Sequence, residues 1–299
     1  DAAVGTAFAL SVVEPMMVGP FGGGFTNFFR PNEGFSTIDG YGSAPGAAHE
    51  KMYKPISNDL AQYFDVEDQL NQNGYLSVGT PANLLAWTHL VEKYGNFNLN
   101  EVIQPSINIA RNGFRVTNYL SDIIKDNINE LSNYKESTNI YLPNGKAPKA
   151  GTIIKNPNYA LTLEGISKYG ATYLHEAELG KHIEDEMKKN GGLVTLDDLK
   201  HQKIFYREPI VGNYKGYKIN SVGPVSSGGI CLIQMLNILE NFNIEKYDIF
   251  DPERIHIISE VFKIVFVDRY KYIGDPEYVN IPINGLISKK YALERANEI

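Results

Sequence analysis

The chain has 299 residues, of which 43% are hydrophobic and 21% charged, with a formal net charge of −7. This is enough apolar material for one large core or two modest ones, so the sequence predicts a globular fold. The negative charge and the lack of a basic cluster argue against a nucleic-acid partner. No stretch reaches the roughly 18 to 20 consecutive apolar residues of a membrane span. Cys231 is the only cysteine, which excludes an internal disulfide and a cysteine-rich zinc site.

Both ends of the sequence have the pattern of a segment cut from a longer protein. The chain begins without Met at Asp1 and enters an apolar stretch, residues 2–13, predicted as a buried helix. It stops in a helical pattern that no Gly, Asn or Pro terminates. A signal peptide or a catalytic residue could therefore lie outside these 299 residues.

A glycine run follows the first predicted helix. Gly22, Gly23 and Gly24 precede an alternating segment, residues 25–30, whose pattern turns at 31–34 and resumes at Phe35. Proline first and glycine last suit a type I turn, so we predict an antiparallel hairpin. A dinucleotide fingerprint needs strand, glycines and helix, whereas here the order is helix, glycines and strand. The glycines are expected to permit positive φ and close approach of another backbone or a small substrate.

The middle of the chain is predicted to be mainly helical. Residues 45–74 are irregular and polar, which indicates a surface excursion. Thr80 and Pro81 are expected to be the N-cap and first-turn proline of a helix that Gly95 ends. Thr195 begins a capping-box pattern. Further helical patterns cover residues 98–113, 118–131, 156–170 and 177–192.

The last third combines strands and helices. Residues 207–223 read as a hairpin with its turn between Gly212 and Gly216, and two apolar helices follow, one opening near Ser226 and one over residues 252–274. Because strands and helices are grouped rather than alternated, we predict an α+β fold with antiparallel sheet covered by helices.

Few residues suggest chemistry by themselves. There is no Gly-x-Ser-x-Gly elbow, and Cys231 is expected to be a small core residue. His175 and Glu176 begin like a zinc-protease motif, but Leu179 stands where the second histidine belongs and His182 is too far along, so a solvated helix face is expected. The run Ser226-Ser227-Gly228-Gly229 is interpreted as a helix cap, with an anion site as the alternative. Asp268-Arg269 is expected to form an ion pair or carbonyl cap, with a catalytic role as its alternative.

Several longer blocks resemble gamma-glutamyltranspeptidases, in the order seen in that family and over essentially the whole chain. The blocks are DAAVGTAFALSVVEPMMVGPFGGGF, IDGYGSAP, SVGTPANLLAWTHLVEKYG, VIQPSINIARNGF, MKKNGGLVTLDDL, SSGGICLIQMLNILENF and VDRYKYIGDPEYVN. The match looks like the large-subunit portion of such an enzyme, with residues 1–299 forming a single domain.

This resemblance implies an N-terminal-nucleophile hydrolase with a four-layer αββα sandwich, of which this chain supplies only part. It implies no cofactor and no metal. The family's precursor cuts itself before a threonine, and this new N-terminal residue attacks the γ-amide carbonyl. A small subunit carries that threonine, so no catalytic residue is assigned in this chain and the chain alone is expected to be inactive. Many relatives are exported, but these residues leave the compartment open.

One departure from the family affects the expected substrate. Where the family normally reads Asp-x-Arg-Glu-x-Ala-Pro, with the arginine gripping the α-carboxylate of the glutamyl group, this chain has Tyr41 and Gly42. We therefore expect an amino-acid-derived substrate shifted away from the usual glutamyl donor. A non-catalytic binding protein of the same fold is the alternative. Gly22, Gly23 and Gly24 are candidates for a loop beside the pocket, or they only allow the first helix to pack tightly on the sheet.

Overall fold

The computed structural model describes residues 1–57 and 65–299, and its contacts divide the chain into two compact units. The first unit comprises Asp1–Gly24 and Gly40–Ile204, and the second comprises Phe25–Asp39 and Phe205–Ile299. Part of the predicted excursion, residues 58–64, lies outside the described residues. Within the described ranges, no helix has the length and apolar character needed to cross a membrane. The prediction of a single domain over 1–299 stays a prediction.

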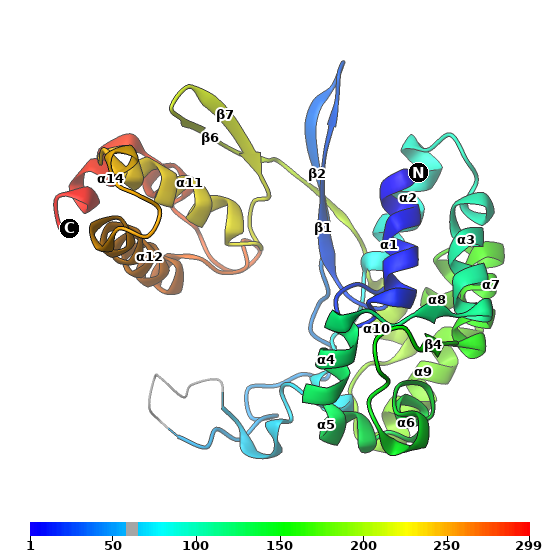
Figure 1. Cartoon of the computed structure of the whole chain (residues 1–299). Helices are drawn as coiled ribbons and strands as arrows, with labels where there is room; N and C mark the ends of the chain where they lie inside the picture. Colours follow the sequence, from blue (N-terminus) through cyan, green and yellow to red (C-terminus); the bar gives the residue numbers. More distant parts are fainter. Residues whose placement is uncertain (58–64) are drawn as a thin grey trace. The chain divides into compact units, whose positions relative to one another are not determined.

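The first unit is built around packed helices (Figure 1). Helix α1 packs against α3, and α3 packs against α7. Phe8 of α1 is fully buried and meets Trp87 of α2 edge-on, with 5.0 Å between ring centroids. The apolar helix predicted at residues 2–13 is therefore present, but only one face of it is fully buried. The helices and strands lying wholly in this unit are α1 (Ala2–Val13), α2 (Asn83–Tyr94), α3 (Leu99–Asn112), β3 (Phe114–Arg115), α4 (Asn118–Asp126), α5 (Ile128–Ser132), α6 (Lys135–Tyr141), β4 (Ile153–Ile154), α7 (Pro157–Tyr169), α8 (Thr172–His175), α9 (Glu178–Asn190) and α10 (Leu196–His201), with short 3-10 turns at Glu67–Gln69, Tyr75–Ser77 and Pro143–Gly145.

Local sequence signals explain where several of these helices begin and end. Asn98 and Glu101 form a reciprocal capping box at the start of α3. Gly191 takes the left-handed conformation, with φ of 78°, just after α9. The helix predicted over residues 118–131 is instead two helices, because Asn127 leaves helical geometry and its side-chain amide donates to the carbonyl of Ile123.

The second unit contains a three-stranded sheet and a separate two-stranded ribbon. The predicted hairpin is confirmed: β1 (Gly24–Arg30) and β2 (Gly34–Gly40) are neighbours in the sheet, and Glu33 N donates to Arg30 O across the turn. Strand β5 (Phe205–Arg207) pairs antiparallel with β2, placing Ile38 opposite Tyr206. Arg207 also forms an ion pair with the buried carboxylate of Asp39, at 3.1 Å.

The two-stranded ribbon of the second unit packs near a helical core. Its strands are β6 (Ile210–Tyr214) and β7 (Tyr217–Ser221), joined by Lys215 and Gly216, both with positive φ. Gly212, predicted at the turn, lies inside β6, where an added Cβ would sit 2.6 Å from the Ile233 side chain. Cys231 is buried in the core, as predicted. The helices of this unit are α11 (Gly228–Leu239), α12 (Pro252–Tyr272), α13 (Ile283–Leu286) and α14 (Lys289–Ala296), with a 3-10 turn at Ile244–Lys246.

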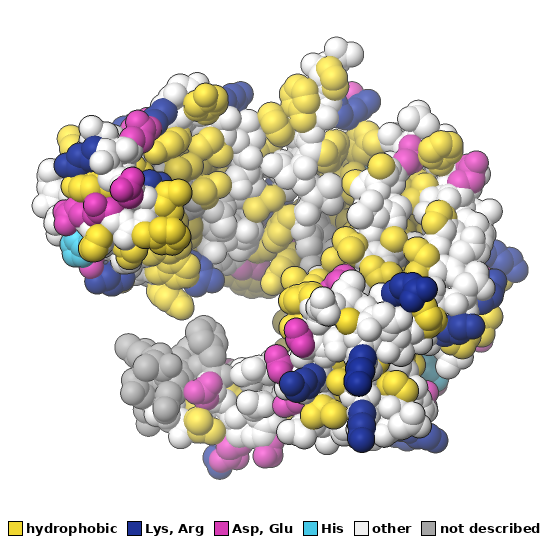
Figure 2. All heavy atoms as spheres, in the orientation of Figure 1, with side chains coloured by type: hydrophobic (Ala, Val, Ile, Leu, Met, Phe, Trp, Pro, Cys, Tyr) yellow, Lys and Arg dark blue, Asp and Glu magenta, His cyan; other side chains and the backbone are white. Residues whose placement is uncertain are grey.

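Mixed helix and strand content across both units confirms the α+β prediction. On the face of the second unit seen in Figure 2, acidic and basic side chains are interspersed with hydrophobic ones.

Candidate functional site

The glycine run packs its backbone against the start of α2. The carbonyl oxygen of Gly22 accepts hydrogen bonds from Ala82 N at 3.1 Å and Asn83 N at 3.0 Å, and Pro20 O accepts from Leu84 N at 3.1 Å. These bonds satisfy amide groups that the helix itself leaves unpaired. The predicted N-cap role of Thr80 is wrong, because the N-cap residue of α2 is Ala82. The carbonyl groups that accept from the first amides of α2 lie about 60 residues earlier in the chain, so no local sequence pattern could predict them.

The three candidate glycines differ in what surrounds them. An added Cβ on Gly23 would lie 2.3 Å from Gly42 N, and one on Gly24 would lie 3.0 Å from Asn83 Oδ1. Gly22 has ordinary spacing, with its nearest neighbour at 3.6 Å. Because all three have φ outside the positive range, the expectation of positive φ is wrong here. The expected close approach of two backbones occurs at Gly23, against Tyr41 and Gly42.

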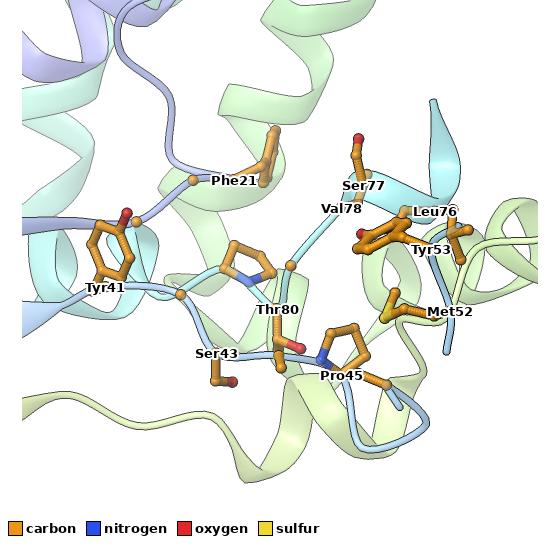
Figure 3. A pocket seen from close by; sticks show the side chains of 17 residues that line it. Phe21, Tyr41, Ser43, Pro45, Met52, Tyr53, Leu76, Ser77, Val78 and Thr80 are labelled. Atoms are coloured by element: carbon orange, nitrogen blue, oxygen red, sulfur yellow. The ribbon is translucent and has the colours of Figure 1, made fainter. Parts of the chain in front are cut away.

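These segments border a cavity of about 570 Å³ in the first unit (Figure 3). Gly22, Gly23, Tyr41 and Gly42 line it, whereas Gly24 does not. Figure 3 shows Phe21 and Tyr41 on one side and the side chains of a second group on the other. That second group consists of Met52, Tyr53 and Leu76, with Pro45 and Thr80 on the wall between. Tyr41 is 56% exposed, and no acidic, basic or histidine side chain belongs to the described lining.

Backbone hydrogen bonds join two chain segments within the wall that contains Thr80. Ser43 N donates to Thr80 O at 3.1 Å, and Thr80 N donates to Ser43 O at 2.8 Å. Gln202 Nε2 adds a bond to Thr80 O at 2.9 Å. The segment after Tyr41 and the segment before α2 are therefore paired at Ser43 and Thr80, and this pair of segments is called the strip below.

The Asp198 carboxylate binds the backbone at Gly46, three residues after Ser43. Asp198, at the start of α10, accepts a hydrogen bond from Gly46 N at 2.7 Å, as well as from Thr195 N and Oγ1 in the predicted capping box. Burial by itself would raise the pKa of Asp198, but these hydrogen bonds stabilise the charged form and the net effect is a lowered pKa.

The histidine candidate lies in a structural position. His175 is buried, and its Nδ1 is 2.8 Å from Leu199 O, so the predicted solvated helix face is wrong. Burial is the main cause of its lowered pKa. Among residues 1–57 and 65–299, no group of three or more histidine, cysteine or acidic side chains could hold a metal ion.

The remaining motifs also have structural partners. Gly229 packs closely against the residue that follows β7, since an added Cβ would lie 2.1 Å from Val222 O. This supports the predicted packing against the preceding strand, but the N-cap residue Ser227 makes no side-chain capping hydrogen bond, so the predicted cap is not formed. Asp268 is buried and accepts from Gln234 Nε2 at 2.5 Å and Tyr291 Oη at 2.9 Å. Arg269 Nε instead donates to Ser227 Oγ at 2.9 Å. These contacts join residues far apart in sequence, so spacing alone did not reveal them.

Comparison with known proteins decides the family. The family model described as Gamma-glutamyltranspeptidase matches residues 1–299. The chain belongs to the gamma-glutamyltranspeptidase family. It is 39% identical over 295 residues to the Acylase ACY 1 proenzyme of Pseudomonas sp. (strain SE83), covering 99% of this chain and 53% of the relative. It is 36% identical over 300 residues to the Glutathione hydrolase proenzyme of Escherichia coli (strain K12), covering 100% and 51%.

Solved structures of gamma-glutamyltranspeptidases and acylases share the fold. The gamma-glutamyltranspeptidase of Helicobacter pylori superposes with a TM-score of 0.92 at 32% identity, covering 100% of this chain and 84% of that chain. The cephalosporin acylase of Bacillus halodurans gives 0.86 at 26% identity, covering 100% and 55%. The predicted N-terminal-nucleophile hydrolase class is thereby confirmed. The chain spans about half the length of the curated relatives it matches, which are named proenzymes.

Proposed function

We propose that this chain is the large-subunit portion of an amide hydrolase or acyltransferase whose donor differs from the usual γ-glutamyl group. Family membership supports the reaction class, since relatives in the comparison are named glutathione hydrolases and acylases. The nucleophile is an N-terminal threonine outside this chain, carried by a small subunit.

The reaction proceeds through a covalent ester. The threonine hydroxyl attacks the amide carbonyl while its own α-amine takes the proton, and the amine of the donor leaves with a proton. Hydrogen-bond donors of the small subunit stabilise the tetrahedral oxyanion. Water or an acceptor amine then takes the acyl group and restores the hydroxyl. This chain contributes a wall of the acyl pocket.

The position of Tyr41 carries the proposed shift in substrate. It replaces the family's carboxylate-binding arginine, and it lines the cavity beside the glycine run. A phenol can donate one hydrogen bond, but it has no positive charge to offer a carboxylate. A charge-assisted contact contributes about 1.5 to 3 kcal/mol, so its loss weakens binding of a glutamyl α-carboxylate by about ten- to a hundredfold.

The test compares the intact protein with Tyr41→Arg on a chromogenic γ-glutamyl anilide. We expect the variant to lower KM for this donor by about tenfold or more. Gly42 is kept, because a Cβ there would lie 2.9 Å from Thr80 O. Tyr119→Arg is the matched control, because Tyr119 is similarly exposed, at 51%, and does not line the cavity.

Two results would contradict the proposal in different ways. Ordinary glutamyl transfer by the unmodified protein, with no gain from Tyr41→Arg, would overturn the substrate shift. An intact protein that neither cleaves itself nor turns over any amide, but still binds a small amino-acid-like ligand, would be the non-catalytic alternative.

A further inference from the structure

We propose that the cavity lined by Phe21, Tyr41, Met52, Tyr53 and Leu76 selects an uncharged, largely apolar acyl group. This inference rests on the proposed function, because it assigns a substrate class to that same site. The replacement of the arginine by Tyr41 implies only that a carboxylate binds weakly. The lining of the cavity indicates in addition which acyl group binds well.

The polar side chains of the far wall already have hydrogen-bond partners. Tyr53 Oη donates to Leu76 O at 3.0 Å, and Ser77 Oγ donates to Gly74 O at 2.8 Å. A ligand that used either hydroxyl as a donor would have to break one of these bonds. A ligand therefore gains binding free energy from this wall mainly by burying apolar surface against it, and not from new hydrogen bonds donated by these hydroxyls.

The backbone of the strip between the two walls is occupied in the same way. The amide and carbonyl groups of Ser43 and Thr80 bond to each other, and the carbonyl of Thr80 accepts a second bond from Gln202. The Thr80 hydroxyl is buried and has no hydrogen-bond partner, and its residue is only 1% exposed. Because this hydroxyl is buried, a ligand in the cavity cannot reach it in the observed side-chain conformation.

Charge also separates this cavity from a carboxylate site. None of its described lining residues carries an ionisable acid or base other than tyrosine. A carboxylate placed here would lose hydration without gaining a cation, which is costly in a partly enclosed apolar site. An alkyl or aromatic acyl chain pays no such penalty. A volume of about 570 Å³ suits a small organic group, since ligand sites commonly span about 300 to 1,000 Å³.

The experiment introduces a cation into the far wall with Met52→Lys. The intact protein and the variant are compared on hexanoyl-p-nitroanilide, which is neutral, and on glutaryl-p-nitroanilide, which ends in a carboxylate. We expect the unmodified protein to prefer the hexanoyl donor, and Met52→Lys to reverse that preference by at least about tenfold in kcat/KM. The matched control is Met16→Lys, since Met16 is half-exposed in the same unit but does not line this cavity. Its preference should match that of the unmodified protein.

Equilibrium binding of hexanamide, measured by calorimetry, separates this inference from the proposed reaction. If neither anilide is hydrolysed but hexanamide binds and Met52→Lys weakens its binding at least about tenfold, the reaction fails and the inference stands. If the anilides are hydrolysed with no acyl preference, or with a glutaryl preference that Met52→Lys leaves unchanged, the inference is overturned and the reaction stands. It is also overturned if Met52→Lys mainly reduces assembly with the small subunit, because the cavity would then be a subunit contact.

Discussion

At the scale of single residues, neighbouring glycines carry different constraints. Gly23 is the position where two backbones meet, since a Cβ would lie 2.3 Å from Gly42 N. The atoms that this Cβ would meet belong to the backbone, which cannot move aside as the end of a flexible side chain can. We expect Gly23→Ala to lower the free energy of unfolding by about 1 to 3 kcal/mol, as overpacking does. Urea unfolding at neutral pH measures this change.

The control for that prediction lies in the same loop. Gly19→Ala meets no atom closer than 4.0 Å and needs no positive φ, so it should be neutral or up to about 1 kcal/mol stabilising. Equal destabilisation by the two variants would show that any alanine in this loop is costly, and that the effect does not come from the contact with Gly42.

At the scale of elements, the capping box of α10 also fastens the strip beside the cavity. The Asp198 carboxylate completes the capping box by accepting from Thr195 N, and it also accepts from Gly46 N, whereas the side chain of its neighbour Asp197 is largely exposed. We expect Asp198→Asn to cost about 1 to 2 kcal/mol of unfolding free energy at pH 7. Asp197→Asn should change it by less than about 0.5 kcal/mol.

The pH dependence of this effect has a defined sign. The folded-state pKa of Asp198 lies below its unfolded value of about 3.9, so its contribution is complete at neutral pH. That contribution is lost as pH falls from about 4 through the lowered folded pKa. The stability gap between the unmodified protein and Asp198→Asn should therefore persist at pH 5 and narrow near pH 3. A gap that widened on acidification would contradict the role of the carboxylate.

At the scale of the whole molecule, this chain spans about half the length of the curated relatives it matches. We expect residues 1–299, produced alone, to show no hydrolysis of γ-glutamyl or hexanoyl anilides, whereas the intact protein hydrolyses one of them. Circular dichroism should verify that the shorter protein is folded. Turnover by residues 1–299 would place a nucleophile inside this chain and overturn the proposed threonine mechanism.

Sequence predicted best those features whose partners are close along the chain. The hairpin turn before Gly34, the Thr195 capping box and the glycine after α9 all depend on residues within a few positions. Thr80 failed as an N-cap because the amides of α2 bond to the distant loop. The burial of His175 likewise depends on α10, 24 residues away from it. That Tyr41 occupies the family's arginine position could be inferred only from the family pattern. The hydrogen bonds of the Tyr53 and Ser77 hydroxyls depend on the folded arrangement and follow from no sequence pattern.

The carbonyl cap on α2 has an electrostatic consequence for this region. A helix start usually attracts anions, because its unpaired N–H groups carry partial positive charge. Here Gly22 and Pro20 already present oxygen atoms to those groups. A phosphate or carboxylate approaching that end would meet a row of partial negative charges and would have to displace three internal bonds. A glycine-rich segment beside a helix start could suggest an anion-binding site. Here the carbonyl groups of that segment occupy the amides that an anion would need.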